Sequence, residues 1–146
     1  MKYIKISLVI IWMLVIFMFS NQKANESTNL SNSFIIKIVD VVEKITNHEF
    51  NNEEVINNYV YPVRKLAHFS IYFILGILTI EAIKHKNNAF ITAIIICALY
   101  SVSDEIHQQF VDGRTGKIID VFIDSIGSLI GIKIDLFISK KIKNLK

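Results

Sequence analysis

Residues 3–20 read YIKISLVIIWMLVIFMFS, an almost unbroken apolar run of the length that a membrane-crossing helix needs. About 20 helical residues span the roughly 30 Å of hydrocarbon in a bilayer. Further apolar runs follow at about residues 66–83, 89–106 and 118–138. Strands cross lipid only as a closed barrel, which four such runs do not supply. The sequence therefore predicts an all-α polytopic membrane protein with four transmembrane helices, whose direct partner is the lipid bilayer.

The composition agrees with a bilayer as the solvent. Hydrophobic residues make up 52% of the 146 residues, more than a soluble domain of this size ordinarily requires. We expect a single domain over residues 1–146, because this length suits one compact unit. The net charge of +3 comes mainly from lysines at the ends of the apolar runs, so nucleic-acid binding is not expected. Lys2 and Lys5 resemble the start of a signal peptide, but the poor cleavage site that follows favours a retained first helix.

The connection between the first two runs, about residues 21–64, is long and polar. Part of it predicts an amphipathic helix of about four turns on the membrane surface or on the bundle, since apolar residues recur there at helical spacing. These residues are Leu30, Phe34, Ile35, Ile38, Val41, Val42 and Ile45. The only proline, Pro62, comes just before the second run and suits the start of that helix. The other two links are short, so the helices that they join should run antiparallel.

The placement of lysines predicts the orientation in the membrane. With the N-terminus inside, the inner side carries Lys2, Lys5, Lys84, Lys86, Lys133, Lys140, Lys141, Lys143 and Lys146. Only Glu81 and Asp135 oppose them there. Cytoplasmic segments of membrane proteins are enriched in Lys and Arg. We therefore expect a multi-pass protein of the cell membrane with both termini in the cytoplasm, and with residues 21–64 and 107–117 on the outer side.

Ionisable residues gather where three of the predicted helices meet the outer side. A central Asp, Lys or Arg costs about 2.5 to 3.5 kcal/mol on membrane-insertion scales, so such residues often mark a functional site. They are Arg64, Lys65 and His68 at the start of the second run, Asp104, Glu105 and His107 at the end of the third, beside the polar Gln108, Arg114 in the next link, and Asp120 and Asp124 at the start of the fourth. Helical spacing places Tyr72 one turn beyond His68 on the same stripe.

The fourth run carries its acids and its small residues on one face. Asp120 and Asp124 share this face with Gly127 and Gly131, and two glycines four residues apart let another helix approach closely. The acids then point into the bundle rather than into lipid. Buried carboxylates need cationic or hydrogen-bonding partners, which the neighbouring arginines, lysine and histidines can supply.

Both arginines of the chain, Arg64 and Arg114, fall within this constellation. The planar and always charged guanidinium group suits bidentate binding of a carboxylate or a phosphate. The residues Asp112 and Gly113 supply a turn that could aim Arg114 back over the acids. This arrangement favours recognition of an anionic group near the outer face.

Several motifs resemble those of the VanZ-like family. The segment RKLAHFSIYFILG at 64–76 resembles the opening of that family's second helix, and SDEIHQQFVDGRTG at 103–116 resembles its most distinctive segment. DVFIDSIG at 120–127 is similar to the paired-Asp start of its last helix, and FSNQ at 19–22 to the polar motif after its first. One departure is Asp112, where many members carry proline before Gly-Arg. The resemblance implies a membrane protein related to one that confers low-level resistance to teicoplanin, a glycopeptide antibiotic, and it implies no settled reaction.

The function that these observations favour is non-enzymatic binding at the outer face. The ligand would be an anionic lipid, a cell-wall precursor or a glycopeptide, and teicoplanin-type resistance would be one outcome. The expected ligand-binding residues are Arg64, Lys65, Tyr72, Gln108 and Arg114. A structural alternative is that the polar residues only hold three helix ends together.

A catalytic alternative is an intramembrane hydrolase or transferase that acts on a lipid-linked substrate. His68 or His107 would be the general base in that case. The acid or orienting partner would be Asp104, Glu105, Asp120 or Asp124. The two histidines and the carboxylates could also surround a divalent metal, but their spacing matches no known metal signature, so the sequence predicts neither a metal nor another cofactor. The sequence does not predict the oligomeric state.

Overall fold

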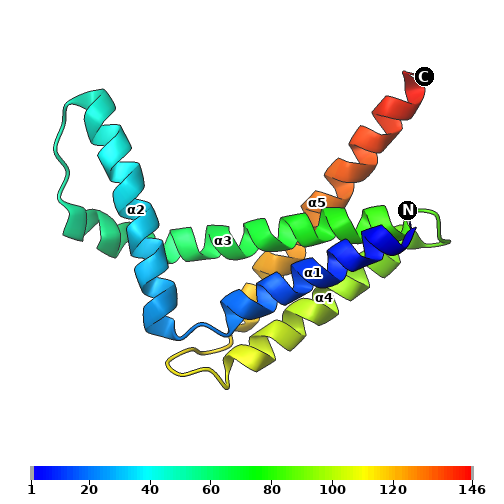
Figure 1. Cartoon of the computed structure of the whole chain (residues 1–146), viewed down its shortest axis with the longest axis horizontal. Coiled ribbons are helices and arrows are strands. Elements are labelled where there is room, and N and C mark those ends of the chain that lie inside the picture. Colours follow the sequence, from blue (N-terminus) through cyan, green and yellow to red (C-terminus); the bar gives the residue numbers. More distant parts are fainter. Residues whose placement is uncertain (1, 146) are drawn as a thin grey trace.

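The computed structural model describes residues 2–145, and within this range the chain is entirely α-helical apart from its links (Figure 1). The helices of this range are α1 (Lys2–Ser20), α2 (Ala24–Thr46), α3 (Asn52–Ile83), α4 (Ala89–Gln108) and α5 (Ile118–Asn144). The all-α prediction is therefore confirmed.

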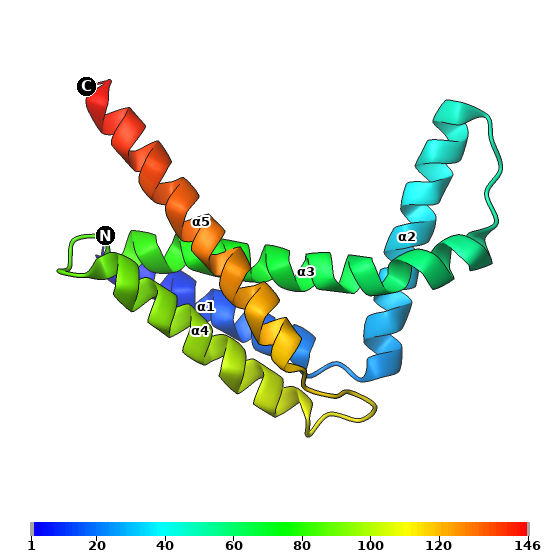
Figure 2. The same ribbon diagram turned by 180° about the vertical axis from the view of Figure 1, so that it is seen from behind.

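Helix α3 is the centre of the arrangement and contacts each of the other four helices. Helices α1 and α4 lie along it, and α5 crosses it, with its C-terminal half projecting beyond the bundle (Figure 2). Helix α2 stands across the first part of α3 and points away from the bundle. The N-terminus and the α3–α4 turn lie at one end of the molecule, whereas the α1–α2 and α4–α5 links lie at the opposite end. The polar residues predicted to meet are therefore on elements that converge at this second end.

Three of the helices are long and apolar enough to cross a membrane, namely Tyr3–Ser20 in α1, Asn52–Ile83 (α3) and Ala89–Gln108 (α4). These correspond to three of the four predicted spans. Helix α5 is long enough but is not among these candidate spans, because charged residues interrupt its apolar surface. They are Asp120, Asp124, Lys133 and Asp135. The crossing of the membrane by α5 therefore stays a prediction.

The start of α3 differs from the prediction, which placed it at Pro62. The helix begins at Asn52, and Pro62 lies inside it. The side chain of Asn51 caps this start, accepting hydrogen bonds from the backbone N–H groups of Glu53 at 3.1 Å and Glu54 at 3.4 Å. A proline inside a helix removes one backbone hydrogen bond and crowds the carbonyl four residues earlier. The Asn51 cap and the two acids in the first turn stabilise the part of the helix that precedes Pro62.

Most of the stretch predicted as a polar loop, residues 21–64, is helical. The predicted amphipathic helix corresponds to α2, which is longer than its apolar pattern indicated. Ile35 and Val39 are the buried residues of α2, whereas Phe34 and Ile38 are exposed at 54% and 46%. An exposed apolar stripe on an amphipathic helix suits contact with the membrane surface.

Helices α3 and α5 touch backbone to backbone through glycines. A Cβ atom on Gly127 would lie 2.5 Å from the carbonyl oxygen of Phe69, and one on Gly76 or Gly131 would overlap the backbone of Ser128 or Phe73. Only a residue without a side chain permits such an approach. The close contact predicted from the glycine spacing in the fourth run is therefore present, and α3 is the partner.

Polar contacts fasten α1 to the rest of the bundle. The indole Nε1 of Trp12 donates to the carbonyl oxygen of Ile71 at 2.8 Å, and the Tyr100 hydroxyl donates to the carbonyl oxygen of Met13 at 2.5 Å. At the opposite end, the Lys5 Nζ lies 2.5 Å from a carboxylate oxygen of Glu81. These contacts fix the position of α1, whose C-terminal end forms one wall of the site.

Candidate functional site

A cavity of about 360 Å³ lies among the end of α1, the start of α2, the middle of α3 and the end of α4. Its walls are mainly apolar and include Ile16, Leu30, Phe34 and Ile71. Its polar lining includes Arg64, His68, Asp104, Gln108 and Arg114. Apolar walls with a few convergent polar groups are typical of sites for small molecules. The cavity therefore has the composition expected for an amphiphilic ligand.

A smaller polar hollow of about 230 Å³ adjoins this cavity. The two spaces share Arg64, His68, Gln108 and Arg114 in their linings. The Lys65 side chain, which lines the hollow, is ion-paired with Asp120. The Lys65 Nζ also lies 5.0 Å from the centre of the Tyr61 ring, within the range of a cation–π contact.

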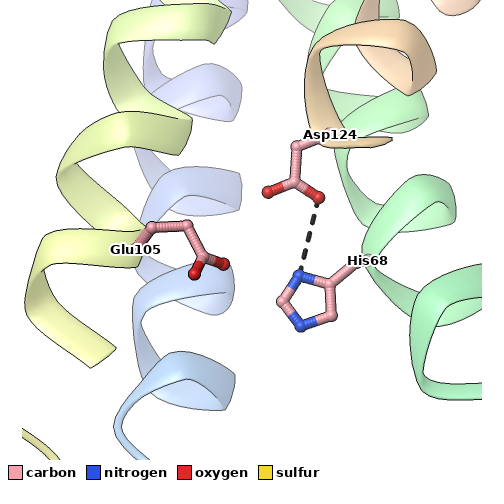
Figure 3. Close-up of side chains that lie close together, drawn as sticks. All are labelled: His68, Glu105 and Asp124. Carbon is pink, nitrogen blue, oxygen red and sulfur yellow. Dashed lines mark ion pairs between the residues drawn. The ribbon is translucent and has the colours of Figure 1, made fainter. Parts of the chain in front are cut away.

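His68, Glu105 and Asp124 lie close together in the site (Figure 3). They come from α3, α4 and α5, and one possible ligand atom from each lies within 4.8 Å of the others. The Nδ1 of His68 and the Oδ1 of Asp124 are 3.5 Å apart. The other carboxylate oxygen of Asp124 accepts a hydrogen bond of 2.9 Å from the Ser101 hydroxyl. Asp124 is next to His68 because the glycine contact draws this part of α5 against α3.

Hydrogen bonds from the end of α4 and the following link hold the remaining acids. The amide nitrogen of Gln108 donates to Asp104 at 3.2 Å and to Glu105 at 3.3 Å. The backbone N–H of Lys117 donates to the second carboxylate oxygen of Glu105 at 2.8 Å. Gly116 packs directly against the carbonyl of Glu105, where a Cβ atom has no room. The link therefore closes tightly over the end of α4.

Three buried carboxylates lack a lysine or arginine partner within residues 2–145. Asp104, Glu105 and Asp124 are exposed by only 5%, 4% and 0%. Of these three acids, Asp124 forms an ion pair, and its partner is His68. Taking a carboxylate out of water without compensation costs several kcal/mol. The site thus holds more buried acid than the side chains around it neutralise by direct pairing.

The arginines do not supply the missing partners, contrary to the expectation that they would face the acids. Arg114 donates from Nη1 to the carbonyl oxygen of Ser20 at 3.2 Å, and its buried Nε has no hydrogen-bond partner. Burial, together with the positive charge of Arg64, lowers the pKa of Arg114 below its ordinary value. An anion beside Arg114 would offset this effect. Of the candidate partners, Lys65 and His68 are the ones that pair with an acid of the site.

Two of the sequence-predicted site residues lie elsewhere. The ring of His107 packs against that of Phe17 of α1 in a tilted arrangement, with ring centres 4.6 Å apart, and its buried Nε2 has no partner. It lines neither the cavity nor the hollow. Tyr72 is fully buried in the core beside Ile16, Leu75 and Cys97, and it also lines neither space. The remaining predicted residues converge on the site described above.

Sequence reasoning missed several residues that complete the site. Gln22, Ser27 and Ser31 line the cavity from the α1–α2 link and from α2. No motif marks them, because their place depends on how α2 packs against α3. The Ser20 carbonyl and the Lys117 N–H are backbone groups, whose roles do not depend on residue type and leave no signal in the sequence.

The family model described as VanZ/LLP1 matches residues 5–139, which is nearly the whole chain. No curated protein and no solved structure matches.

Proposed function

This chain belongs to the VanZ/LLP1 family, and we propose that it is an envelope membrane protein that binds an amphiphile with an anionic head group. The observation that carries the proposal is the 360 Å³ cavity, which joins apolar walls to Arg64 and Arg114, and neither arginine has a carboxylate partner among the described residues 2–145. A phosphate or carboxylate would lie between Arg64 and Arg114, and an acyl or prenyl chain would lie along the walls.

The polar groups divide the cavity by charge. A guanidinium group binds phosphate or carboxylate oxygens through two parallel hydrogen bonds, and the unpartnered Nε of Arg114 is one such donor. Asp104 also lines the cavity, and its carboxylate repels an anion that penetrates further. The head group therefore stops at the arginines. Ligands of this form include an anionic phospholipid, a lipid-linked cell-wall precursor and an acylated glycopeptide of the teicoplanin type.

The proposal includes an orientation in which both termini are cytoplasmic and the arginines face outward. The start of α1 and the α3–α4 turn lie at the end of the molecule opposite to the α4–α5 link (Figure 1). These two segments carry Lys5, Lys84 and Lys86, whereas Arg114 is in the α4–α5 link, which supports this orientation under the positive-inside rule. Cys97 is buried, so a cysteine introduced at an exposed position is the one that reacts. In intact cells, a membrane-impermeant maleimide should label Asp112→Cys and spare Lys86→Cys. Labelling of Lys86→Cys without labelling of Asp112→Cys would show that the protein has the opposite orientation.

The binding proposal is tested with purified protein in nanodiscs. Native mass spectrometry compares retention of phosphatidylglycerol with retention of zwitterionic phosphatidylcholine, and a parallel titration uses teicoplanin. We expect wild type to retain the anionic lipid preferentially, and Arg114→Gln and Arg64→Gln to reduce this preference by about tenfold, since a charged hydrogen bond contributes roughly 1.5 to 3 kcal/mol. The matched control is Lys37→Gln, which removes a positive charge from the exposed face of α2.

Two results would count against amphiphile binding. One is equal retention of the two lipids by wild type together with no binding of teicoplanin. The other is an effect of Lys37→Gln as large as that of the arginine variants, because the preference would then reflect overall charge and not the cavity. Binding of teicoplanin without lipid preference would identify the glycopeptide as the ligand.

The pairing of His68 with Asp124 supports a second candidate, hydrolysis or transfer on a lipid-linked substrate. An imidazole oriented by a buried carboxylate is the usual form of a general base, and His68 lines the cavity. The test is conversion of radiolabelled envelope lipids by wild type, with His68→Gln as the inactive variant and His107→Gln as the control. Equal conversion by wild type and His68→Gln would exclude this role for His68.

A further inference from the structure

We propose that His68, Glu105 and Asp124 bind a divalent transition-metal ion, with Zn²⁺ as the reference case. The three residues come from three different helices and bring one imidazole and two carboxylates together within 4.8 Å. Ligands of a tetrahedral Zn²⁺ ion lie about 2.0 to 2.2 Å from the metal, and thus roughly 3.4 Å from each other. The 3.5 Å between the His68 Nδ1 and the Asp124 Oδ1 already matches this spacing.

Two of the three ligand atoms, the His68 Nδ1 and the Asp124 Oδ1, are buried and make no hydrogen bond, whereas the Glu105 carboxylate accepts hydrogen bonds from Gln108 and from the Lys117 N–H. The side chain of Asp124 has no exposed surface, and its Oδ1 has no hydrogen-bond partner. The His68 Nδ1 is also buried without a partner. The two atoms point toward a shared position that Glu105 faces from α4 (Figure 3). Buried polar atoms are almost always hydrogen-bonded in native proteins, and a metal at this position would satisfy both of them.

The ligand set favours a transition metal over magnesium or calcium. Mg²⁺ and Ca²⁺ prefer oxygen ligands alone, whereas an imidazole with carboxylates suits Zn²⁺, Mn²⁺ or Fe²⁺. A divalent ion would also balance the buried acids that have no lysine or arginine partner. The hydrogen bonds from Ser101 to Asp124 and from the Lys117 N–H to Glu105 would hold both carboxylates in place, as partners of metal ligands commonly do.

Three protein ligands would leave one position of a four-coordinate ion for a further ligand. Of the three residues, His68 is the one that also lines the cavity and the hollow. Three protein ligands with one open position is the arrangement of catalytic rather than structural zinc sites. Metal binding does not depend on the proposed binding of an amphiphile, and the two are measured separately.

The test is a titration of the full chain, purified in detergent and stripped with a chelator, with Zn²⁺. We expect wild type to bind one Zn²⁺ per chain and to give a Co²⁺ derivative with visible absorption bands typical of nitrogen and oxygen ligands. His68→Gln and Asp124→Asn should weaken Zn²⁺ binding by more than about 100-fold, since changing even the partners of metal ligands costs 10- to 100-fold. Glu105→Gln should act in the same direction.

The controls are His107→Gln and Asp112→Asn, which remove the same chemical groups at the same end of the bundle, Asp112 from an exposed position in the α4–α5 link. Both should bind Zn²⁺ as wild type does. Size-exclusion elution and circular dichroism of each variant separate a lost ligand from a lost fold, and the Co²⁺ spectrum of wild type is a readout that needs no variant. The proposal is overturned if wild type binds no Zn²⁺ and gives no Co²⁺ bands. It is also overturned if folded His68→Gln and Asp124→Asn bind Zn²⁺ as tightly as the controls.

Discussion

Adding one methyl group at Gly127 should separate the two helices that form the site. The Cβ atom of Gly127→Ala would lie 2.5 Å from the carbonyl oxygen of Phe69 and 3.3 Å from its carbonyl carbon. Ordinary van der Waals contact begins at 3.4 Å, so α3 and α5 must move apart by about 0.9 Å at this point. Overpacking of this kind costs about 1 to 3 kcal/mol. The same movement widens the 3.5 Å separation between His68 and Asp124.

The free energy of unfolding is measured by titration with sodium dodecyl sulfate in mixed micelles, followed by circular dichroism. The matched control is Ile126→Ala, which changes the neighbouring residue of α5 at a position that is 51% exposed. Removing side-chain volume there should matter little, because substitutions at exposed positions usually change stability by less than about 0.5 kcal/mol. The reasoning fails if Gly127→Ala unfolds within about 0.5 kcal/mol of wild type, the range of an ordinary surface change. It also fails if Ile126→Ala is the more damaging of the two.

Three further changes test individual contacts by the same unfolding titration. Trp12→Phe removes the 2.8 Å hydrogen bond to the Ile71 carbonyl and should cost about 1 kcal/mol, and a neutral result would show that water replaces it. Lys65→Met leaves the carboxylate of Asp120 buried without its cation and should cost about 3 to 5 kcal/mol, part of which Asp120→Asn should restore in the double variant. Gly113→Val places a β-branched residue at a φ of 74° and should cost at least about 1 kcal/mol, whereas Gly113→Asn should cost less.

The helices could be predicted because lipid imposes a simple rule of length and hydrophobicity. The predicted runs at about residues 3–20 and 89–106 are mainly apolar, and they correspond to the candidate spans Tyr3–Ser20 and Ala89–Gln108. The start of α3 could not be placed in the same way. Pro62 resembles a helix boundary, and the cap by Asn51 was not distinctive among the many asparagines of this polar stretch. Helix α5 shows the limit of the rule, since the acids that build the site also reduce its hydropathy.

Helical periodicity predicted the shared face of the fourth run, but not which atoms pair across the helices. The face shared by Asp120, Asp124 and the glycines was readable from spacing alone, because it depends on one helix. Pairing depends on how helices cross and on where links return. Arg114 consequently bonds to a backbone carbonyl of α1, and His107 turns onto Phe17. The proposed metal ligands come from three separate helices, so no local spacing could reveal them.

The glycine contact between α3 and α5 has a consequence for how the cavity opens. His68 and Asp124 are carried by two helices that are in backbone contact, so their spacing cannot adjust when a ligand arrives. The opposite wall is held differently. Helix α2 packs on α3 through Ile35 and Val39, and its start is tied to the α4–α5 link by one backbone hydrogen bond from Ala24 to Asp112 and by an exposed ion pair from Lys23. A larger ligand would therefore displace α2 rather than α3 or α5. The cavity would accept ligands with acyl or prenyl chains of different length, while His68 and Asp124 keep their relative positions.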